Sequence, residues 1–240
     1  MLDSPLGAFA APFRGLRLVA LPRFRRYAAL PLLLNIVLFS AMGALAFSQA
    51  GTWIDQLLPA GGWHDYVRWL AWPVLALAFL LVSFFTFTAV GNVIAAPFAD
   101  RLAERVLADL GSGGGPPVPL AAGVARSLAD GLRKLWHLAS RALPVLLLFL
   151  VPGVNLVAPA VWFLVGSWLL AVEYLEYAAG AQGVGFVEQR RRMRRNPLLA
   201  LGFGAGVAVL TLTPVLNLAA IPASVAGACL LWHERLRPAP

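Results

Sequence analysis

The hydrophobic pattern along the chain consists of four long runs that contain no charged residue. None of these runs includes Asp, Glu, Lys or Arg, and they cover residues 27–54, 69–99, 142–172 and 196–232. A helix needs about 20 apolar residues to cross roughly 30 Å of hydrocarbon, and every run is longer than this. The pattern therefore predicts an all-α integral membrane protein.

The third and fourth runs are interrupted in their middles by one shared pattern, Pro-x-x-Asn-Leu followed by a second proline. It covers Pro152–Pro159 in the third run and Pro214–Pro222 in the fourth. Proline ends a helix and Asn favours turns, so each run divides into pieces of roughly 10 to 16 residues, too short to span alone. The first two runs predict two long transmembrane helices, and the last two predict re-entrant, hemi-penetrating helical hairpins. Kinked single spans are also compatible with the pattern.

The distribution of charge favours the hairpins. Five arginines precede the first run, and five more lie between the third and fourth runs: Arg14, Arg17, Arg23, Arg25 and Arg26; then Arg190, Arg191, Arg192, Arg194 and Arg195. Basic residues favour the cytoplasmic side of a membrane. If every run crossed once, the second cluster would lie outside. If the last two runs are re-entrant, all arginine-rich segments lie on one side.

The connections between the runs predict amphipathic helices within one membrane domain, residues 1–240. Leu102, Val106 and Leu110 recur every four residues, a second amphipathic stretch covers 120–140, and a Gly/Pro-rich linker at 111–117 separates the two. In order, the domain then comprises a basic N-terminal segment (1–26), two spanning helices (27–99), amphipathic helices (100–141), the first hairpin (142–172), a basic connection (173–195) and the second hairpin (196–232).

The composition of the chain and its motifs argue against several classes of function. The chain is 60% hydrophobic and 12% charged, with a net charge of +8. We attribute the positive balance to membrane orientation and not to nucleic-acid binding. His64, His137 and His233 have no neighbouring Cys or Glu at metal-ligand spacing, and we interpret them as interfacial polar residues. No nucleotide-binding loop occurs either. We therefore expect no enzymatic activity, metal or cofactor.

The runs also lack the acidic residues that proton-driven carriers use within their spans. Any transport is therefore expected to be passive and channel-like, and Glu104, just beyond the second run, is the nearest acidic candidate for coupling.

One local motif has the chemistry of an anion site. Pro22-Arg23-Phe24-Arg25-Arg26 precedes the first run, and Pro22 predicts a helix start with the arginines in its first turn. A helix N-terminus carries partial positive charge, so adjacent cations are unfavourable there unless an anion binds. Backbone N–H groups and guanidinium groups together can hold a tetrahedral oxyanion. The alternative is a simple positive-inside anchor.

Several blocks in order resemble the CysZ family of sulfate permeases, from about residue 7 to 236. These blocks are Gly15–Leu18, Leu21–Tyr27, Leu30–Asn35, Asn92–Phe98 with Leu102–Glu104, Pro152–Pro159 with Trp162 and Phe163, Glu173–Tyr177, and Pro214–Pro222. The resemblance implies a multi-pass protein of the bacterial inner membrane that forms homo-oligomers and imports sulfate for assimilation into cysteine. It also implies a sulfate site at Arg25 and Arg26, flanked by Pro22, Arg23 and Phe24.

The sequence and the resemblance lead to two hypotheses for the function of the chain, from different classes. The leading hypothesis is a channel-like sulfate permease, with Asn35 and Asn92 as uncharged hydrogen-bonding groups along the route. For each Asn taken singly, helix–helix hydrogen bonding is the favoured role. The competing hypothesis is a non-transporting membrane scaffold whose basic helices contact anionic lipids. The expected partners are thus sulfate, membrane lipids and further copies of the chain.

Overall fold

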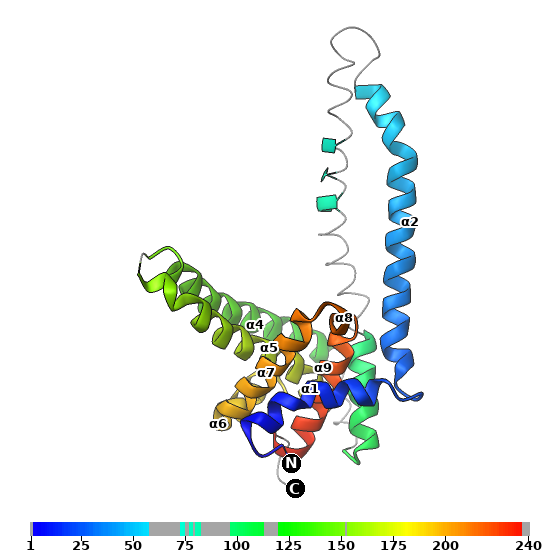
Figure 1. Cartoon of the computed structure of the whole chain (residues 1–240). Helices are drawn as coiled ribbons and strands as arrows, with labels where there is room; N and C mark the ends of the chain where they lie inside the picture. Colours follow the sequence, from blue (N-terminus) through cyan, green and yellow to red (C-terminus); the bar gives the residue numbers. More distant parts are fainter. Residues whose placement is uncertain are drawn as a thin grey trace. The chain divides into compact units, whose positions relative to one another are not determined.

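The computed structural model describes residues 2–57, 73–74, 77–78, 80–82, 97–112, 120–151 and 153–236. Helices make up most of these ranges, and no strand occurs within them (Figure 1). The predicted all-α class is confirmed. The chain forms two compact units, residues 29–98 and the remainder, 1–28 with 99–240. We describe each unit by itself.

The first apolar run forms one continuous helix, as predicted. Helix α2 (Arg25–Leu57) has 33 residues and is therefore about 50 Å long, more than the hydrocarbon thickness of a bilayer. Large apolar side chains are exposed along it: Leu30, Leu33, Leu34, Ile36, Val37, Phe39 and Leu45. Contact with lipid would cover such a surface. The second run lies mostly outside the described residues, and its described parts at 73–74, 77–78 and 80–82 are helical.

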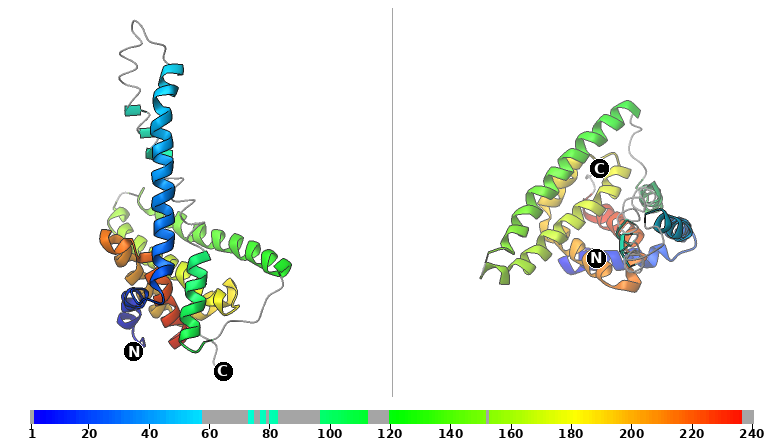
Figure 2. Two further views of the ribbon diagram at one scale, coloured as in Figure 1. Left: turned by 90° about the vertical axis from the view of Figure 1, so that its right-hand side faces the viewer. Right: turned by 90° about the horizontal axis from the view of Figure 1, so that it is seen from above.

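The third run folds back at its predicted break. Helix α4 (Leu120–Leu148) is followed by the short 3₁₀ helix η1 (Val154–Leu156) and by α5 (Ala158–Ala181). Helices α4 and α5 contact each other and lie side by side (Figures 1 and 2). Gly153 has φ +83° in the turn between them, a conformation that disfavours other residues.

The predicted arm lengths of this first hairpin are wrong. Helix α4 begins at Leu120, so the amphipathic connection and the first arm form one helix. Helix α5 has 24 residues because it continues nine residues beyond the apolar run that ends at 172, through Glu173 and Glu176. The two glutamates are good helix formers and pair with Lys134 of α4, so nothing ends the helix there.

The fourth run breaks where predicted, and its arms have the predicted lengths. The chain continues from α6 (Phe186–Arg195) through α7 (Pro197–Leu212) and the short α8 (Pro214–Asn217) to α9 (Ala220–Leu231), and ends in a π-helical turn, η2 (Trp232–Leu236). Helix α7 has 16 residues and α9 has 12. Proline at 197 lacks the N–H that would continue α6, and the axis bends by 105° there.

Within the described residues, helix α5 is by itself long and apolar enough to cross a membrane. The bent pair of α6 and α7 would be a second such segment if it formed one span.

Small residues bring the helices of the larger unit into close contact. Helix α1 (Pro5–Val19) is capped by Ser4, whose Oγ accepts a hydrogen bond from Gly7 N–H at 3.1 Å. It packs across α7 and α9 (Figure 2). A Cβ atom on Gly206 of α7 would overlap the Phe9 carbonyl of α1, and one on Gly204 would overlap the Ser167 carbonyl of α5. Such small-residue contacts are typical of helix packing in membranes.

The helix at residues 97–109 confirms the predicted amphipathic pattern. Leu102 and Val106 are buried in the core, and Leu110, just past its end, packs against that core. The linker that follows is described only at residues 111 and 112.

Candidate anion-binding site

The predicted anion motif lies in the turn between α1 and α2. The prediction that Pro22 opens the helix is wrong, because α2 begins at Arg25. The N–H groups of Phe24 and Arg25 both donate to the Leu21 carbonyl, at 2.9 and 3.0 Å, which closes a separate tight turn before the helix. Arg25 and Arg26 are nevertheless the first two residues of α2, so the expectation that they lie in its first turn is correct.

Phe24 anchors this turn to the protein. Its side chain is 1% exposed and belongs to the main hydrophobic core. Only its backbone can therefore face a bound ion, while Pro22 is exposed beside it. The burial of one aromatic ring fixes the position of the exposed residues on either side of it.

Arg23 already has a counter-ion. Its Nη2 lies 3.0 Å from Oδ2 of Asp109, and its guanidinium lies 5.0 Å from the centre of the Phe24 ring. Asp109 ends the helix at 97–109, so this ion pair also ties that helix to the turn. The positive charge of Arg23 is thus largely balanced within the protein.

Arg25 and Arg26 differ from Arg23 in this respect. Both are exposed, and neither forms an ion pair with an acidic side chain in the described part of the chain. Nη2 of Arg26 donates to the Tyr27 hydroxyl at 3.1 Å, and its guanidinium lies 5.0 Å from the centre of the Tyr27 ring. The helix start therefore presents two unbalanced cations, one of which is oriented by its neighbour.

The structure describes two of the three predicted pathway residues. Asn35 lies ten positions further along α2 than Arg25, and Asn92 lies outside the described residues. Glu104 is exposed on the helix at 97–109.

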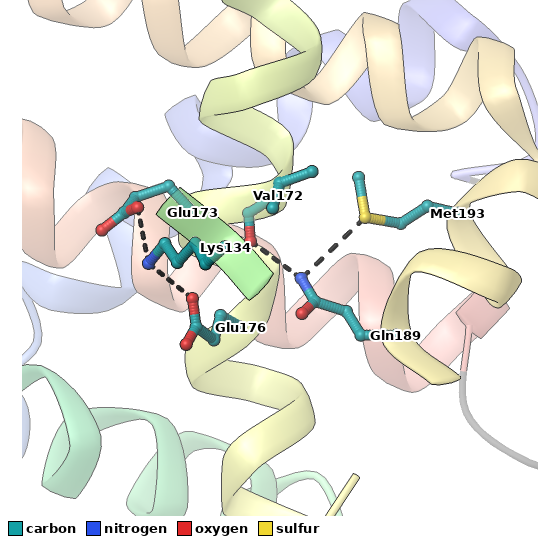
Figure 3. Close-up of polar contacts among 6 residues, drawn as sticks. All are labelled: Lys134, Val172, Glu173, Glu176, Gln189 and Met193. Atoms are coloured by element: carbon teal, nitrogen blue, oxygen red, sulfur yellow. Dashed lines mark hydrogen bonds and ion pairs between the residues drawn. The ribbon is translucent and has the colours of Figure 1, made fainter. Parts of the chain in front are cut away.

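Sequence reasoning missed a charged cluster between α4 and α5, just outside the predicted bounds of the first hairpin. Figure 3 shows Lys134 of α4 between Glu173 and Glu176 of α5. Its Nζ lies 2.7 Å from Oε2 of Glu173 and 2.6 Å from Oε2 of Glu176. The two glutamates are three residues apart and so share one helix face, a spacing that could have indicated a shared partner.

Electrostatics favours the charged form of Lys134. Burial lowers the pKa of Lys134, but its hydrogen bonds and Coulomb attraction to the two glutamates outweigh burial, and the net pKa is raised. Desolvation, followed by the charges of Glu104 and Glu176, raises the pKa of Asp100. Glu104 is therefore part of a wider acidic environment that also includes the hairpin.

A buried amide joins the hairpin to α6. Nε2 of Gln189 donates to the Val172 carbonyl at 2.8 Å and lies 3.9 Å from Sδ of Met193 (Figure 3). Gln189 is fully buried, so this contact fixes α6 against α5.

The interpretation of His137 as an interfacial polar residue is wrong. Its side chain is 2% exposed. Nδ1 lies 2.6 Å from Nη1 of Arg141 and accepts a hydrogen bond from it, and Nε2 lies 3.3 Å from Trp168 Nε1. Burial, and then the charges of Arg190, Arg141 and Arg194, lower the pKa of His137 to about 4. The ring is therefore neutral at pH 7.

The chain is similar to named transporters over almost all of its length. The family model described as "Sulfate transporter CysZ/Etoposide-induced protein 2.4" matches residues 11–222. A sulfate transporter CysZ of Pectobacterium atrosepticum is 39% identical, covering 94% of this chain and 84% of that protein. The Pseudomonas aeruginosa protein of the same name is 37% identical, with 91% of each chain covered. The one from Salmonella typhimurium is 35% identical, covering 92% of this chain and 89% of that protein.

Proposed function

Because this membrane protein belongs to the sulfate transporter CysZ/etoposide-induced protein 2.4 family, we propose that it is a sulfate permease of the bacterial inner membrane. Imported sulfate would supply assimilation into cysteine. The relatives are named as transporters, so the proposed activity is transport and not catalysis. The observation that carries the anion assignment is the pair of exposed, unbalanced arginines at the start of α2.

Arg25 and Arg26 capture the anion in this proposal. A sulfate dianion would balance two guanidinium groups, and charge-assisted hydrogen bonds are among the strongest that side chains form. The partial positive charge of the helix start adds to the attraction. Arg23, which Asp109 already balances, and the Phe24 backbone position the turn.

The route beyond the capture site is channel-like in this proposal. None of the four apolar runs contains an acidic residue that could carry a proton through the bilayer. Asn35 and Asn92 would supply uncharged hydrogen bonds, which release a dianion more readily than fixed cations do.

The proposed topology has two spanning helices and two hairpins that leave the bilayer on the side where they enter it. It keeps the basic segments 1–26 and 173–195 on one face. In a Cys229→Ala background, single cysteines at Gly131, Ala181 and Asn196 should react with an impermeant thiol reagent from one face only, and cysteines at the hairpin tips, Val154 and Leu218, should be protected. Reaction of positions 131 and 181 from opposite faces would exclude the first hairpin.

The decisive test of function is uptake of radiolabelled sulfate by liposomes containing only the purified protein. We expect uptake down a sulfate gradient without an imposed pH gradient, compared with protein-free liposomes of the same lipid. Absence of protein-dependent uptake would favour a membrane scaffold. A strict requirement for a proton gradient would instead refute the channel-like route and leave permease activity standing. Cross-linking in the same membranes tests the proposed homo-oligomer.

A further inference from the structure

A second group of arginines lines a cavity on α6, apart from the α1–α2 turn. The cavity has a volume of about 440 Å³ and is lined by Val187, Arg190, Arg191, Arg194 and Arg195. This volume lies within the roughly 300–1,000 Å³ of small-molecule sites. We call this feature the arginine pocket.

The arrangement of these arginines is unfavourable for an isolated helix. Arg190 and Arg194 are four residues apart, as are Arg191 and Arg195, and like charges at this spacing destabilise a helix. Glu188 is the acidic residue of α6, and it pairs with Arg192 at 2.9 Å and, more weakly, with Arg191 at 3.9 Å. Within the described part of the chain, Arg190, Arg194 and Arg195 have no ion-pair partner.

Arg190 carries the clearest sign of a missing partner. Its Nε is buried and has no hydrogen-bond partner, although its guanidinium lies over the Phe186 ring at 5.4 Å. Leaving a buried donor of a charged group unsatisfied is costly, and native proteins usually satisfy such groups. An acceptor in the pocket would remove this cost if the surrounding side chains shifted to let it reach the Nε.

Helix α4 adds a further cation to the same region. Burial, and then the charges of Arg194 and Arg141, lower the pKa of Arg190, and burial followed by Arg194 does the same for Arg141. These three guanidinium groups therefore lie within Coulomb range of one another. Arg141 is held by Nδ1 of His137, which is neutral and does not offset the positive charge. The surplus charge thus comes from two helices.

We propose that the arginine pocket, with Arg190 and Arg194 as its principal ligands, binds a phosphate-type tetrahedral oxyanion. The planar fork of a guanidinium group can donate two hydrogen bonds to a pair of oxygens on such an ion, a geometry that an ammonium group lacks. Anionic lipid headgroups and free phosphate or sulfate share this chemistry. The site is separate from Arg25 and Arg26 and does not depend on their role in transport.

The test compares two variants that lose the same charge. Arg190→Gln/Arg194→Gln removes the principal ligands, and Arg101→Gln/Arg105→Gln removes two exposed arginines from the helix at 97–109. Both are made in an Arg25→Ala/Arg26→Ala background, so that the α1–α2 turn contributes nothing. One arm titrates inorganic phosphate and sulfate calorimetrically against protein in neutral detergent. The other counts phosphatidylglycerol and phosphatidic acid molecules retained in native mass spectra, with phosphatidylcholine as the neutral comparison.

We expect the pocket variant to bind the oxyanion at least about tenfold more weakly than the background protein, which corresponds to the loss of one charge-assisted contact. The control variant should bind as the background protein does. Binding in the first arm assigns the pocket to free ions, and binding restricted to the second arm assigns it to lipid headgroups. Equal binding by both variants, or no binding in either arm, overturns the proposal.

A third variant keeps the test valid if the double substitution prevents folding. Arg190→Lys keeps the charge but removes the buried Nε donor, so we expect it to fold and to lose only part of the affinity. Full affinity in this variant would show that the buried donor is not a ligand, which also contradicts the proposal.

Discussion

The sharpest prediction about the proposed sulfate site concerns the sulfate affinity of a variant in which Arg25 and Arg26 are both replaced by alanine. Each charge-assisted hydrogen bond contributes about 1.5–3 kcal/mol. Both side chains are exposed, so solvent screening places the expected contribution at the lower end, about 3 kcal/mol for the pair. Since about 1.4 kcal/mol corresponds to a tenfold change in affinity, the double variant should bind sulfate about a hundredfold more weakly.

The structure supplies a matched control for this variant. Arg23 is a neighbouring exposed arginine in the same turn, but Asp109 lies 3.0 Å from its Nη2 and balances its charge. Exposed ion pairs contribute at most about 1 kcal/mol, so Arg23→Ala should change sulfate affinity by no more than about fivefold. Calorimetric titration of the purified proteins measures both effects under the same conditions.

Lysine replacements distinguish a binding site from a topological anchor. An ammonium group keeps the charge but loses the planar fork of guanidinium, so Arg25→Lys/Arg26→Lys should recover only part of the affinity. An anchor would accept lysine fully and would affect orientation when removed. Wild-type sulfate affinity in a correctly oriented double alanine variant would refute the site, as would an equal loss in Arg23→Ala.

Three further predictions concern stability in detergent. Gly206→Ala should destabilise the protein by about 1–3 kcal/mol, because the added Cβ overlaps the α1 backbone. The control Gly166→Ala places its Cβ in open space and should be neutral or slightly stabilising. Thermal unfolding midpoints of the two variants test this, and equal midpoints would contradict the packing of α1 against α7. The His137 pKa of about 4 is lower than its unfolded value of about 6.5, so the unfolded state binds the proton more readily and stability should fall, by up to about 1.4 kcal/mol per pH unit, as the pH drops from 6.5 to 4. His137→Gln should flatten that pH profile, and an unchanged profile would exclude His137 as its cause. Lys134→Met leaves Glu173 and Glu176 without their shared cation and should lower the free energy of unfolding by about 1 kcal/mol near neutral pH. Adding Glu176→Gln should restore most of this loss. A double variant no more stable than the single one would contradict the shared ion pair.

The secondary structure of this chain follows largely from local chemistry. The combination of proline and asparagine in the middles of the third and fourth runs favours a break in each helix, because proline lacks a donor and Asn favours turns. The breaks near Gly153 and Thr213 therefore agreed with prediction. The four-residue spacing of Leu102 and Val106 likewise predicted a buried helix face. Helix ends were less predictable, as α5 shows.

The sequence also identified the arginine-rich turn, but not which of its arginines form an ion pair with an acidic side chain. That depends on Asp109, which lies 86 positions after Arg23 and reaches it only through folding. For the same reason, the spacing of Glu173 and Glu176 could indicate a shared partner but not that this partner is Lys134, and the burial of His137 could not be predicted from the sequence. Local periodicity and proline chemistry are properties of neighbouring residues, whereas charge balance and burial are properties of side chains that only the tertiary structure brings together.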